Sequence, residues 1–233
     1  MDTVLLFDID GTLLVSVRGK GYRGEIARAL ERVFGTSGTI GETRFDGKTD
    51  LAILREALAP DGVTYEAIVE RLPEWQAAFL ELNARLAVES PLFVRCPGVG
   101  EVLAAVESDE RYVLSVLTGN LEATAGAKLE AVGLGHHFRL RGAYGSDHHD
   151  RNELPAIAAG RIVEQTGRAY EPPDFVIVGD TPRDIEAART FGMRCVAVAT
   201  GHFNVEQLAV YGPDALLPDL ADVDAFLGAL AGL

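Results

Sequence analysis

Short apolar runs alternate with helical patterns after residue 97, and this alternation constrains the fold more than any other feature of the chain. The runs, rich in β-branched and aromatic residues, occupy residues 112–117, 138–142, 175–178 and 195–199. Apolar side chains recur at helical spacing in residues 97–107, 122–133, 152–167 and 220–230. Near-continuous apolar strands separated by helices predict a doubly wound parallel α/β sheet, a Rossmann-like core with helices on both faces.

Residues 15–93 interrupt this rhythm, because they carry helical patterns and no convincing strand. Pro73 lies inside an apolar stripe and predicts a kink, or a second helix that begins near it. Trp75 and Phe79 belong to the same stripe and are interpreted as core residues. The chain is therefore expected to form a core from residues 1–14 and 94–233, with an all-helical cap inserted as residues 15–93.

The composition limits the classes of partner. A net charge of −14 disfavours nucleic acid, because a phosphate backbone attracts basic surfaces. No apolar run is long enough to cross a membrane and no leader pattern opens the chain, so a cytoplasmic protein is expected. Cys96 and Cys195 are interpreted as reduced core residues rather than zinc ligands. The pattern favours no particular oligomeric state.

Polar residues follow three expected strands at the point where each strand ends. These segments are Asp8-Ile9-Asp10-Gly11-Thr12, Thr118-Gly119-Asn120 and Gly179-Asp180-Thr181-Pro182-Arg183-Asp184. The carboxyl ends of parallel strands meet at one edge of the sheet, where open α/β proteins bind ligands. Carboxylates gathered there repel one another unless a cation binds, and oxygen ligands without His or Cys suit a hard ion, most simply Mg²⁺.

Asp184 also has a structural explanation. Pro182 suits the first position of a helix for which Thr181 is the N-cap. Asp184 then falls in the first turn, where the helix dipole favours a carboxylate. Helix capping and metal binding both stay open for Asp184.

The combination of DxDGT and GDTPxD resembles the haloacid dehalogenase (HAD) superfamily, specifically phosphoglycolate-phosphatase-like enzymes with a helical cap, over the whole chain. The resemblance implies that Asp8 is the nucleophile that forms an aspartyl-phosphate. It implies that Asp10 protonates the leaving oxygen and then activates water. It also implies a Mg²⁺ ion held by Asp8, the backbone carbonyl of Asp10, Asp180 and, directly or indirectly, Asp184.

The same resemblance assigns the phosphate contacts. Thr118 would donate its hydroxyl and Gly119 its backbone N–H to the phosphate, while Asn120 could cap the following helix. The family usually places a lysine before the helix after its third motif, but here Arg151 is the best-placed cation, and its guanidinium is not geometrically equivalent to an ammonium. Lys128 falls inside a helical pattern and is expected to be solvated.

In the cap, the resemblance points to a substrate-reading loop at residues 45–50. Lys48 and Arg44 are thereby expected to contact the leaving group, with a solvated charge on a turn as the alternative for Lys48. Arg18 and Lys20 lie beside glycines where the chain enters the cap. Those glycines could allow a hinge motion that closes the site and excludes water.

These expectations combine into a Mg²⁺-dependent phosphatase that hydrolyses a small phosphorylated metabolite. A phosphomutase stays open, because it has the same core and passes the phosphoryl group to a second hydroxyl instead of water. A phosphonate hydrolase would need a Schiff-base lysine in the cap, for which Lys48 and Lys20 are the candidates. A non-catalytic binding protein is expected to lack Asp8 or Asp10, and both are present.

Overall fold

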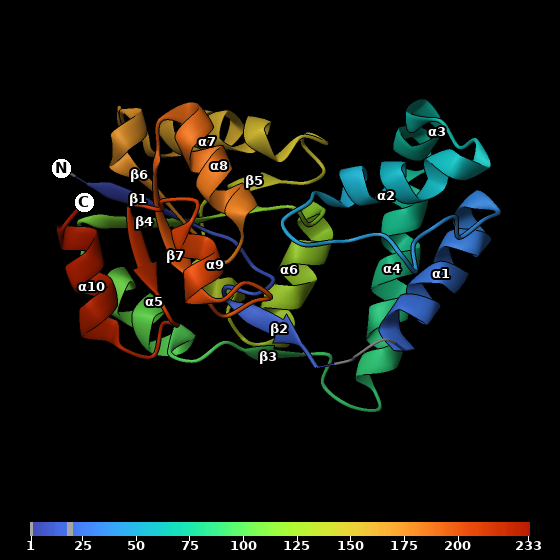
Figure 1. The fold of residues 1–233 in the computed structure, drawn as a ribbon, viewed down its shortest axis with the longest axis horizontal. Coiled ribbons are helices and arrows are strands. Elements are labelled where there is room, and N and C mark those ends of the chain that lie inside the picture. The colour runs from blue at the N-terminus through green and yellow to red at the C-terminus, as the bar shows by residue number, and fades with distance from the viewer. Residues whose placement is uncertain (1, 18–20) are drawn as a thin grey trace.

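A six-stranded parallel sheet forms the centre of one half of the protein, in a computed structural model that describes residues 2–17 and 21–233 (Figure 1). The strands lie in the order β5-β4-β1-β6-β7-β8. Their bounds are β1 Thr3–Phe7, β4 Tyr112–Thr118, β5 Ala143–Tyr144, β6 Phe175–Gly179, β7 Arg194–Val198 and β8 Ala215–Leu217. Because β4 and β6 flank β1, the carboxyl ends of these three strands lie side by side. This place is the topological switch point, where the order of the strands changes direction.

Helices cover both faces of the sheet, as the alternation of the sequence predicts. Val4 and Leu6 of β1 pack into one apolar cluster, and Leu5 and Phe7 into the other, since successive strand residues point to opposite faces. The first cluster includes residues of α7 Leu154–Thr166 and α8 Pro182–Phe191, and the second those of α5 Val99–Glu107, α6 Glu122–Ala131 and α10 Val223–Ala231. The doubly wound α/β core is therefore confirmed.

The edges of the sheet differ from the sequence-based expectation. The strand expected at residues 138–142 is wrong, because only Ala143 and Tyr144 pair with β4. Gly142 lies so close to the carbonyl oxygen of Val116 in β4 that a Cβ there would overlap it. The opposite edge strand, β8, and the short helix α9 Val205–Ala209 were not expected.

Between β1 and β4 the chain forms a helical insertion. Its helices are α1 Gly21–Phe34, α2 Asp50–Leu58, α3 Tyr65–Glu70 and α4 Leu72–Ala87. Pro73 lies in the first turn of α4, directly after α3, which confirms two helices at this proline. Short 3₁₀ turns complete the description: η1 Ala59–Asp61, η2 Gly135–His137, η3 Arg151–Glu153 and η4 Pro172–Asp174.

Two short strands, which sequence reasoning missed, connect the insertion to the core. β2 Leu14–Ser16 and β3 Phe93–Arg95 form an antiparallel ribbon, in which Leu14 pairs with Arg95 and Ser16 with Phe93. The chain therefore leaves and re-enters the core at adjacent points.

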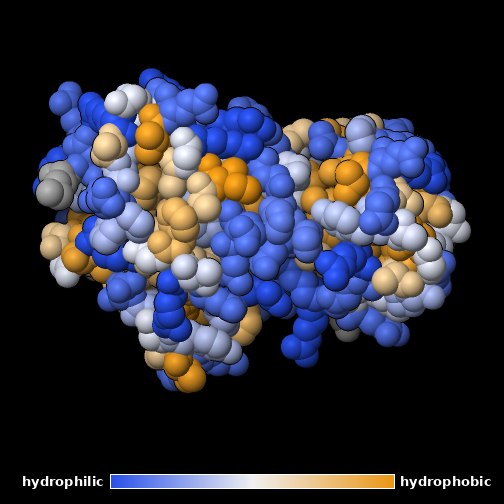
Figure 2. All heavy atoms as spheres, turned by 90° about the horizontal axis from the view of Figure 1, so that it is seen from above, coloured by the Kyte–Doolittle hydropathy of each residue, from blue (hydrophilic) through white to orange (hydrophobic). Residues whose placement is uncertain are grey.

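The surface shows two lobes, which correspond to the core and the helical insertion, with hydrophilic residues gathered at the junction between them (Figure 2). Within the described ranges, no helix has both the length and the apolar character that crossing a membrane requires.

Candidate active site

Three buried aspartates meet at the carboxyl edge of the sheet. Asp8 follows β1, Asp180 follows β6 and Asp184 lies in the first turn of α8. Each offers a carboxylate oxygen within 4.8 Å of those of the other two. In the described part of the chain, no other group of three or more His, Cys, Asp or Glu side chains has this geometry. The structure thus brings together three of the residues singled out from the sequence.

Two glycines make this close approach possible. Gly11 has a φ of 85°, in the left-handed region, and a Cβ there would overlap the carboxylate of Asp180. A Cβ at Gly179 would overlap the carboxylate of Asp184. The small residues of both motifs therefore leave space for the aspartates that follow or face them.

Asp184 does cap its helix. Its Oδ2 accepts hydrogen bonds from the backbone N–H of Thr181 at 3.0 Å and from the Thr181 hydroxyl at 2.7 Å. Its Oδ1 contacts the Arg151 guanidinium. The Asp184 carboxylate therefore fixes the start of α8 and also belongs to the acidic cluster of Asp8, Asp180 and Asp184.

Arg151 links the acidic cluster to the insertion. Its Nη2 lies 3.0 Å from Asp8 Oδ2 and also contacts Asp184, while Nη1 donates to the carbonyl oxygen of Gly47 at 3.3 Å. The side chain is only 4% exposed, so these charge interactions are poorly screened. The structure thus places Arg151 against the expected nucleophile, where the family lysine was expected.

The acidic cluster carries more negative charge than Arg151 neutralises. Burial raises the pKa of Asp8 to about 6, with Arg151 opposing the rise and Asp184 adding to it. Burial, reinforced by Asp184 and Asp8, raises the pKa of Asp180 well above its usual range. Without a further cation these carboxylates are driven toward protonation. Buried oxygen donors of this kind fit a hard divalent metal ion, which would supply the missing positive charge.

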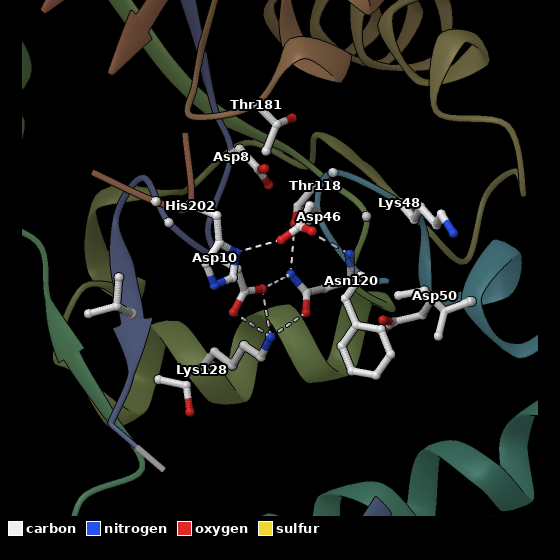
Figure 3. A pocket seen from close by; sticks show the side chains of 18 of the residues that line it. Asp8, Asp10, Asp46, Lys48, Asp50, Thr118, Asn120, Lys128, Thr181 and His202 are labelled. Atoms are coloured by element: carbon white, nitrogen blue, oxygen red, sulfur yellow. Dashed lines mark hydrogen bonds and ion pairs between the residues drawn. The ribbon is translucent and has the colours of Figure 1, made fainter. Parts of the chain in front are cut away.

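A second network surrounds Asp10, whose side chain is 46% exposed (Figure 3). Lys128 Nζ donates to both carboxylate oxygens of Asp10, at 2.8 and 2.6 Å, and to Asn120 Oδ1 at 2.6 Å. Asn120 Nδ2 donates to Asp10 Oδ2 at 2.7 Å and to Thr118 Oγ1 at 2.8 Å. Because the Thr118 oxygen already accepts from Asn120, its hydroxyl proton is free to point into the cavity that Thr118 lines.

The expectation of a solvated Lys128 was wrong. Lys128 lies one helical turn after Thr124 and Ala125, both fully buried, so it shares the face of α6 that is turned inward. This spacing was the signal that could have found it. Asn120 does not cap α6, because its side chain is committed to Asp10, Thr118 and Lys128.

The loop before α2 docks on the core at the same edge. The Asp50 N–H donates to the carbonyl oxygen of Gly119 at 2.7 Å, and the Leu121 N–H donates to Asp50 Oδ2 at 2.9 Å. The Thr49 hydroxyl donates to the carbonyl oxygen of His149 at 2.6 Å. Burial raises the pKa of Asp50 to about 6. Asp50 ends the loop expected to read the substrate, but its contact with the core was not expected: its carboxylate accepts from a backbone N–H at the start of α6.

The expected cap residues differ in position. Lys48 lines the cavity but pairs with Glu56, and its amino group points away from Asp8 and Asp10 (Figure 3). Arg44 is exposed and does not line the cavity, because it lies on the outer part of the loop before Phe45. The structure therefore does not bring Arg44 to the site. Arg18 and Lys20, named above as hinge residues, lie outside the described residues.

A cavity of about 560 Å³ connects Asp8 and Asp180 with the network around Asp10. Asp8, Asp10, Thr118 and Asp180 lie on its core side. Its other walls come from the helical insertion, the β2–β3 ribbon and the core loop at Thr200, Gly201 and His202. A volume of this size suits a small-molecule ligand.

Known proteins are similar to this chain over nearly its whole length. A phosphoglycolate phosphatase from Synechococcus elongatus is 30% identical over 225 residues, covering 94% of each chain. A phosphoglycolate phosphatase from Pseudomonas putida is 25% identical over 222 residues, covering 93% of this chain and 76% of the relative. The crystal structure of CbbY from Rhodobacter sphaeroides, in complex with phosphate, superposes with a TM-score of 0.69 at 21% identity, covering 100% and 99% of the two chains.

A family model described as HAD-hydrolase-like matches residues 154–223, the segment that contains Asp180 and Asp184. Together with the full-length match at 30% identity, this establishes the family. The chain belongs to the HAD superfamily of hydrolases, within its phosphoglycolate-phosphatase-like family.

Proposed function

We propose that the protein is a Mg²⁺-dependent phosphatase that hydrolyses a small phosphorylated metabolite through an aspartyl-phosphate on Asp8. The observation that carries this proposal is the junction of the buried acidic cluster with the cavity, where Asp8 faces both Arg151 and the space for a ligand. Relatives named phosphoglycolate phosphatase support the reaction class. Residues 1–14 and 94–233 act as the catalytic core, and residues 15–93 as its cap.

Asp8 is oriented for attack on phosphorus. Its Oδ1 accepts the N–H of Ile9 at 2.7 Å, and its Oδ2 lies 3.0 Å from Arg151 Nη2. Both contacts fix the carboxylate while leaving lone pairs available. In the first step an Asp8 oxygen forms a bond to phosphorus as the bond from phosphorus to the leaving oxygen breaks.

Asp10 transfers the protons of both steps. It gives a proton to the leaving oxygen, and it later removes one from the water that attacks phosphorus and releases Asp8 and inorganic phosphate. In the structure, its carboxylate accepts hydrogen bonds from Lys128 and Asn120. Before it can protonate the leaving oxygen, Asp10 must therefore take up a proton from solvent, to which its side chain is 46% exposed, and exchange one of these partners for the substrate.

The phosphate is held by Thr118, Gly119 and Arg151. The Thr118 hydroxyl has a free proton, and all three residues line the cavity next to Asp8. Lys48 and Arg44 carry less of the function than the sequence suggests, since Lys48 is paired with Glu56 and Arg44 is outside the cavity. A Mg²⁺ ion held by Asp8, the Asp10 carbonyl, Asp180 and Asp184 would neutralise phosphate charge.

The test is hydrolysis of p-nitrophenyl phosphate with Mg²⁺ or with EDTA, by wild-type protein and by Asp8→Asn. Activity should require Mg²⁺, and Asp8→Asn should lose at least about 10³-fold in kcat while unfolding at a similar temperature. Near-normal turnover by Asp8→Asn would reject the nucleophile. Release of inorganic phosphate from a sugar phosphate indicates a phosphatase, whereas formation of an isomer without release indicates a phosphomutase.

A further inference from the structure

The cavity has a polar end and an apolar end. The polar end contains Asp8, Asp10, Asp180, Thr118 and Arg151. The apolar end is lined by side chains of the insertion and the ribbon, which are Val15, Tyr22, Ile26, Ile40, Phe45, Ile53, Leu54, Trp75, Phe79 and Phe93. A phosphate that reaches Asp8 would therefore direct its organic group toward apolar side chains.

Five of these ten side chains are aromatic. Trp75 and Phe79 stack with ring centroids 5.4 Å apart, and the Tyr22 ring lies 6.3 Å from that of Phe79. The Tyr22 hydroxyl donates to Asn83 Oδ1 at 2.5 Å, which satisfies its polar atom within the insertion. Tyr22, Trp75 and Phe79 together form an aromatic wall, whose rings are held in place by packing and by this hydrogen bond. They offer apolar faces to the cavity.

Most cations on the cavity wall already have carboxylate partners. Lys48 pairs with Glu56, Lys128 with Asp10 and Arg151 with Asp8. Among the described lining residues, Arg23 is the arginine or lysine that has no carboxylate within 4.0 Å.

Arg23 has structural partners instead. Its Nη1 donates to three backbone carbonyls, of which the closest is Thr43 at 2.7 Å, and its guanidinium lies 4.2 Å from the centre of the Phe45 ring. These contacts tie α1 to the loop before α2. Arg23 is therefore already engaged in holding the cap together.

We propose that the preferred substrate is a phosphate monoester whose organic group carries an aromatic ring or an apolar body of similar size. This inference rests on the proposed phosphatase function and specifies its substrate class. A two-carbon carboxylate such as the glycolate part of phosphoglycolate would leave the aromatic wall unfilled. Its charge would also have to be met by Arg23, at the cost of desolvation among apolar side chains.

The first test compares three phosphate monoesters under Mg²⁺: 2-phenylethyl phosphate, ethyl phosphate and phosphoglycolate. Phenylethanol and ethanol are leaving groups of similar acidity, so a difference between their esters reports recognition and not chemical reactivity. We expect kcat/KM for 2-phenylethyl phosphate to exceed that for ethyl phosphate by at least about ten-fold. An equal or higher value for ethyl phosphate or phosphoglycolate would overturn the substrate class and leave the phosphatase function intact.

The second test measures binding without turnover. Trp75 is the single tryptophan of the chain and lies in the aromatic wall, so its fluorescence reports occupancy directly. In the Asp8→Asn protein with Mg²⁺, 2-phenylethyl phosphate should produce a saturable change that competes with inorganic phosphate. Ethyl phosphate should leave the emission unchanged. If no ester is hydrolysed by wild-type protein but this fluorescence change occurs, the catalytic proposal fails and the recognition proposal stands.

Two matched variants separate recognition from packing. Phe79 lines the cavity, whereas Phe34 packs against Trp75 with centroids 6.4 Å apart but does not line it. Phe79→Ala should remove most of the preference for the phenylethyl ester, with KM rising for that ester and little change for ethyl phosphate. Phe34→Ala should keep the preference. Equal loss in both variants, or in neither, would contradict a direct contact between Phe79 and the substrate.

Discussion

Replacing Lys128 by methionine tests whether the network around Asp10 prepares it for proton transfer. Lys128 Nζ makes two hydrogen bonds to Asp10 and one to Asn120, and its side chain is only 11% exposed. A hydrogen bond to a charged group contributes about 1.5–3 kcal/mol. If one such contribution is lost from the positioning of Asp10, kcat falls about ten-fold to about 150-fold, since each 1.4 kcal/mol is a factor of ten.

The assay is steady-state hydrolysis of a phosphate monoester with saturating Mg²⁺. KM should change less than kcat, because Lys128 contacts Asp10 and Asn120 and not the phosphate-binding residues. Lys128→Arg, which keeps the charge, should recover part of the activity. Arg141→Met is the matched control. Arg141 donates two hydrogen bonds, of 2.8 and 2.6 Å, to Glu122, which lies on the same helix as Lys128. Arg141 and Glu122 do not line the cavity. Equal effects of Lys128→Met and Arg141→Met would refute the reasoning.

Three further changes test the cap contacts, the acidic cluster and the buried Asp50. Gly119→Ala places a Cβ against the carbonyl oxygen of Lys48 and should displace the docked loop, which should lower kcat/KM by at least about ten-fold. Gly126→Ala is the control, because a Cβ at Gly126 on α6 meets open space. This control should raise the free energy of unfolding by about 0.5–1 kcal/mol. Asp180→Asn should raise the Mg²⁺ concentration for half-maximal activity at least about ten-fold, and an unchanged titration would remove Asp180 from the metal site. Burial raises the pKa of Asp50 from 3.8 to about 6, so the folded state binds its proton more tightly than the unfolded state, and stability falls as the pH rises between these values. Asp50→Asn keeps an acceptor for the Leu121 N–H. In urea unfolding, its free energy of unfolding relative to that of wild type should rise by about 1–2 kcal/mol from pH 4 to pH 7. A difference that does not change with pH would contradict this.

The convergence of Asp8 and Asp180 could be predicted because it depends on strand ends alone. Both residues follow buried runs, and parallel neighbours bring their carboxyl ends to one edge. The placement of Arg151 was predicted by resemblance, and the contacts with Asp8 and Asp184 give it a physical basis. For Asp8 and Asp180 the sequence pattern was sufficient, because the ends of buried parallel strands determine where these residues lie.

Lys128 and Asp50 could not be placed in the same way, because each depends on how two elements dock. The inward face of α6 was readable from Thr124 and Ala125, but the reach of Lys128 to Asp10 depends on the distance from helix to strand end. Asp50 meets Leu121 across 71 positions, and no local pattern encodes that contact.

The β2–β3 ribbon escaped prediction for a different reason. Strands of three residues are too short to show a clear alternation of apolar and polar side chains. Their pairing also depends on residues separated by the whole helical insertion.

This ribbon makes the helical insertion a removable cassette. Ser16 and Phe93 face each other across the two strands, so a short turn joining them would convert the ribbon into a hairpin. The hydrogen bonds of β1 to β4 and β6 do not pass through the excised segment. The loop before α2 is the exception, because it bonds to Gly119, Leu121 and Arg151 of the core. A replacement module would therefore have to supply these contacts to keep the reaction centre intact.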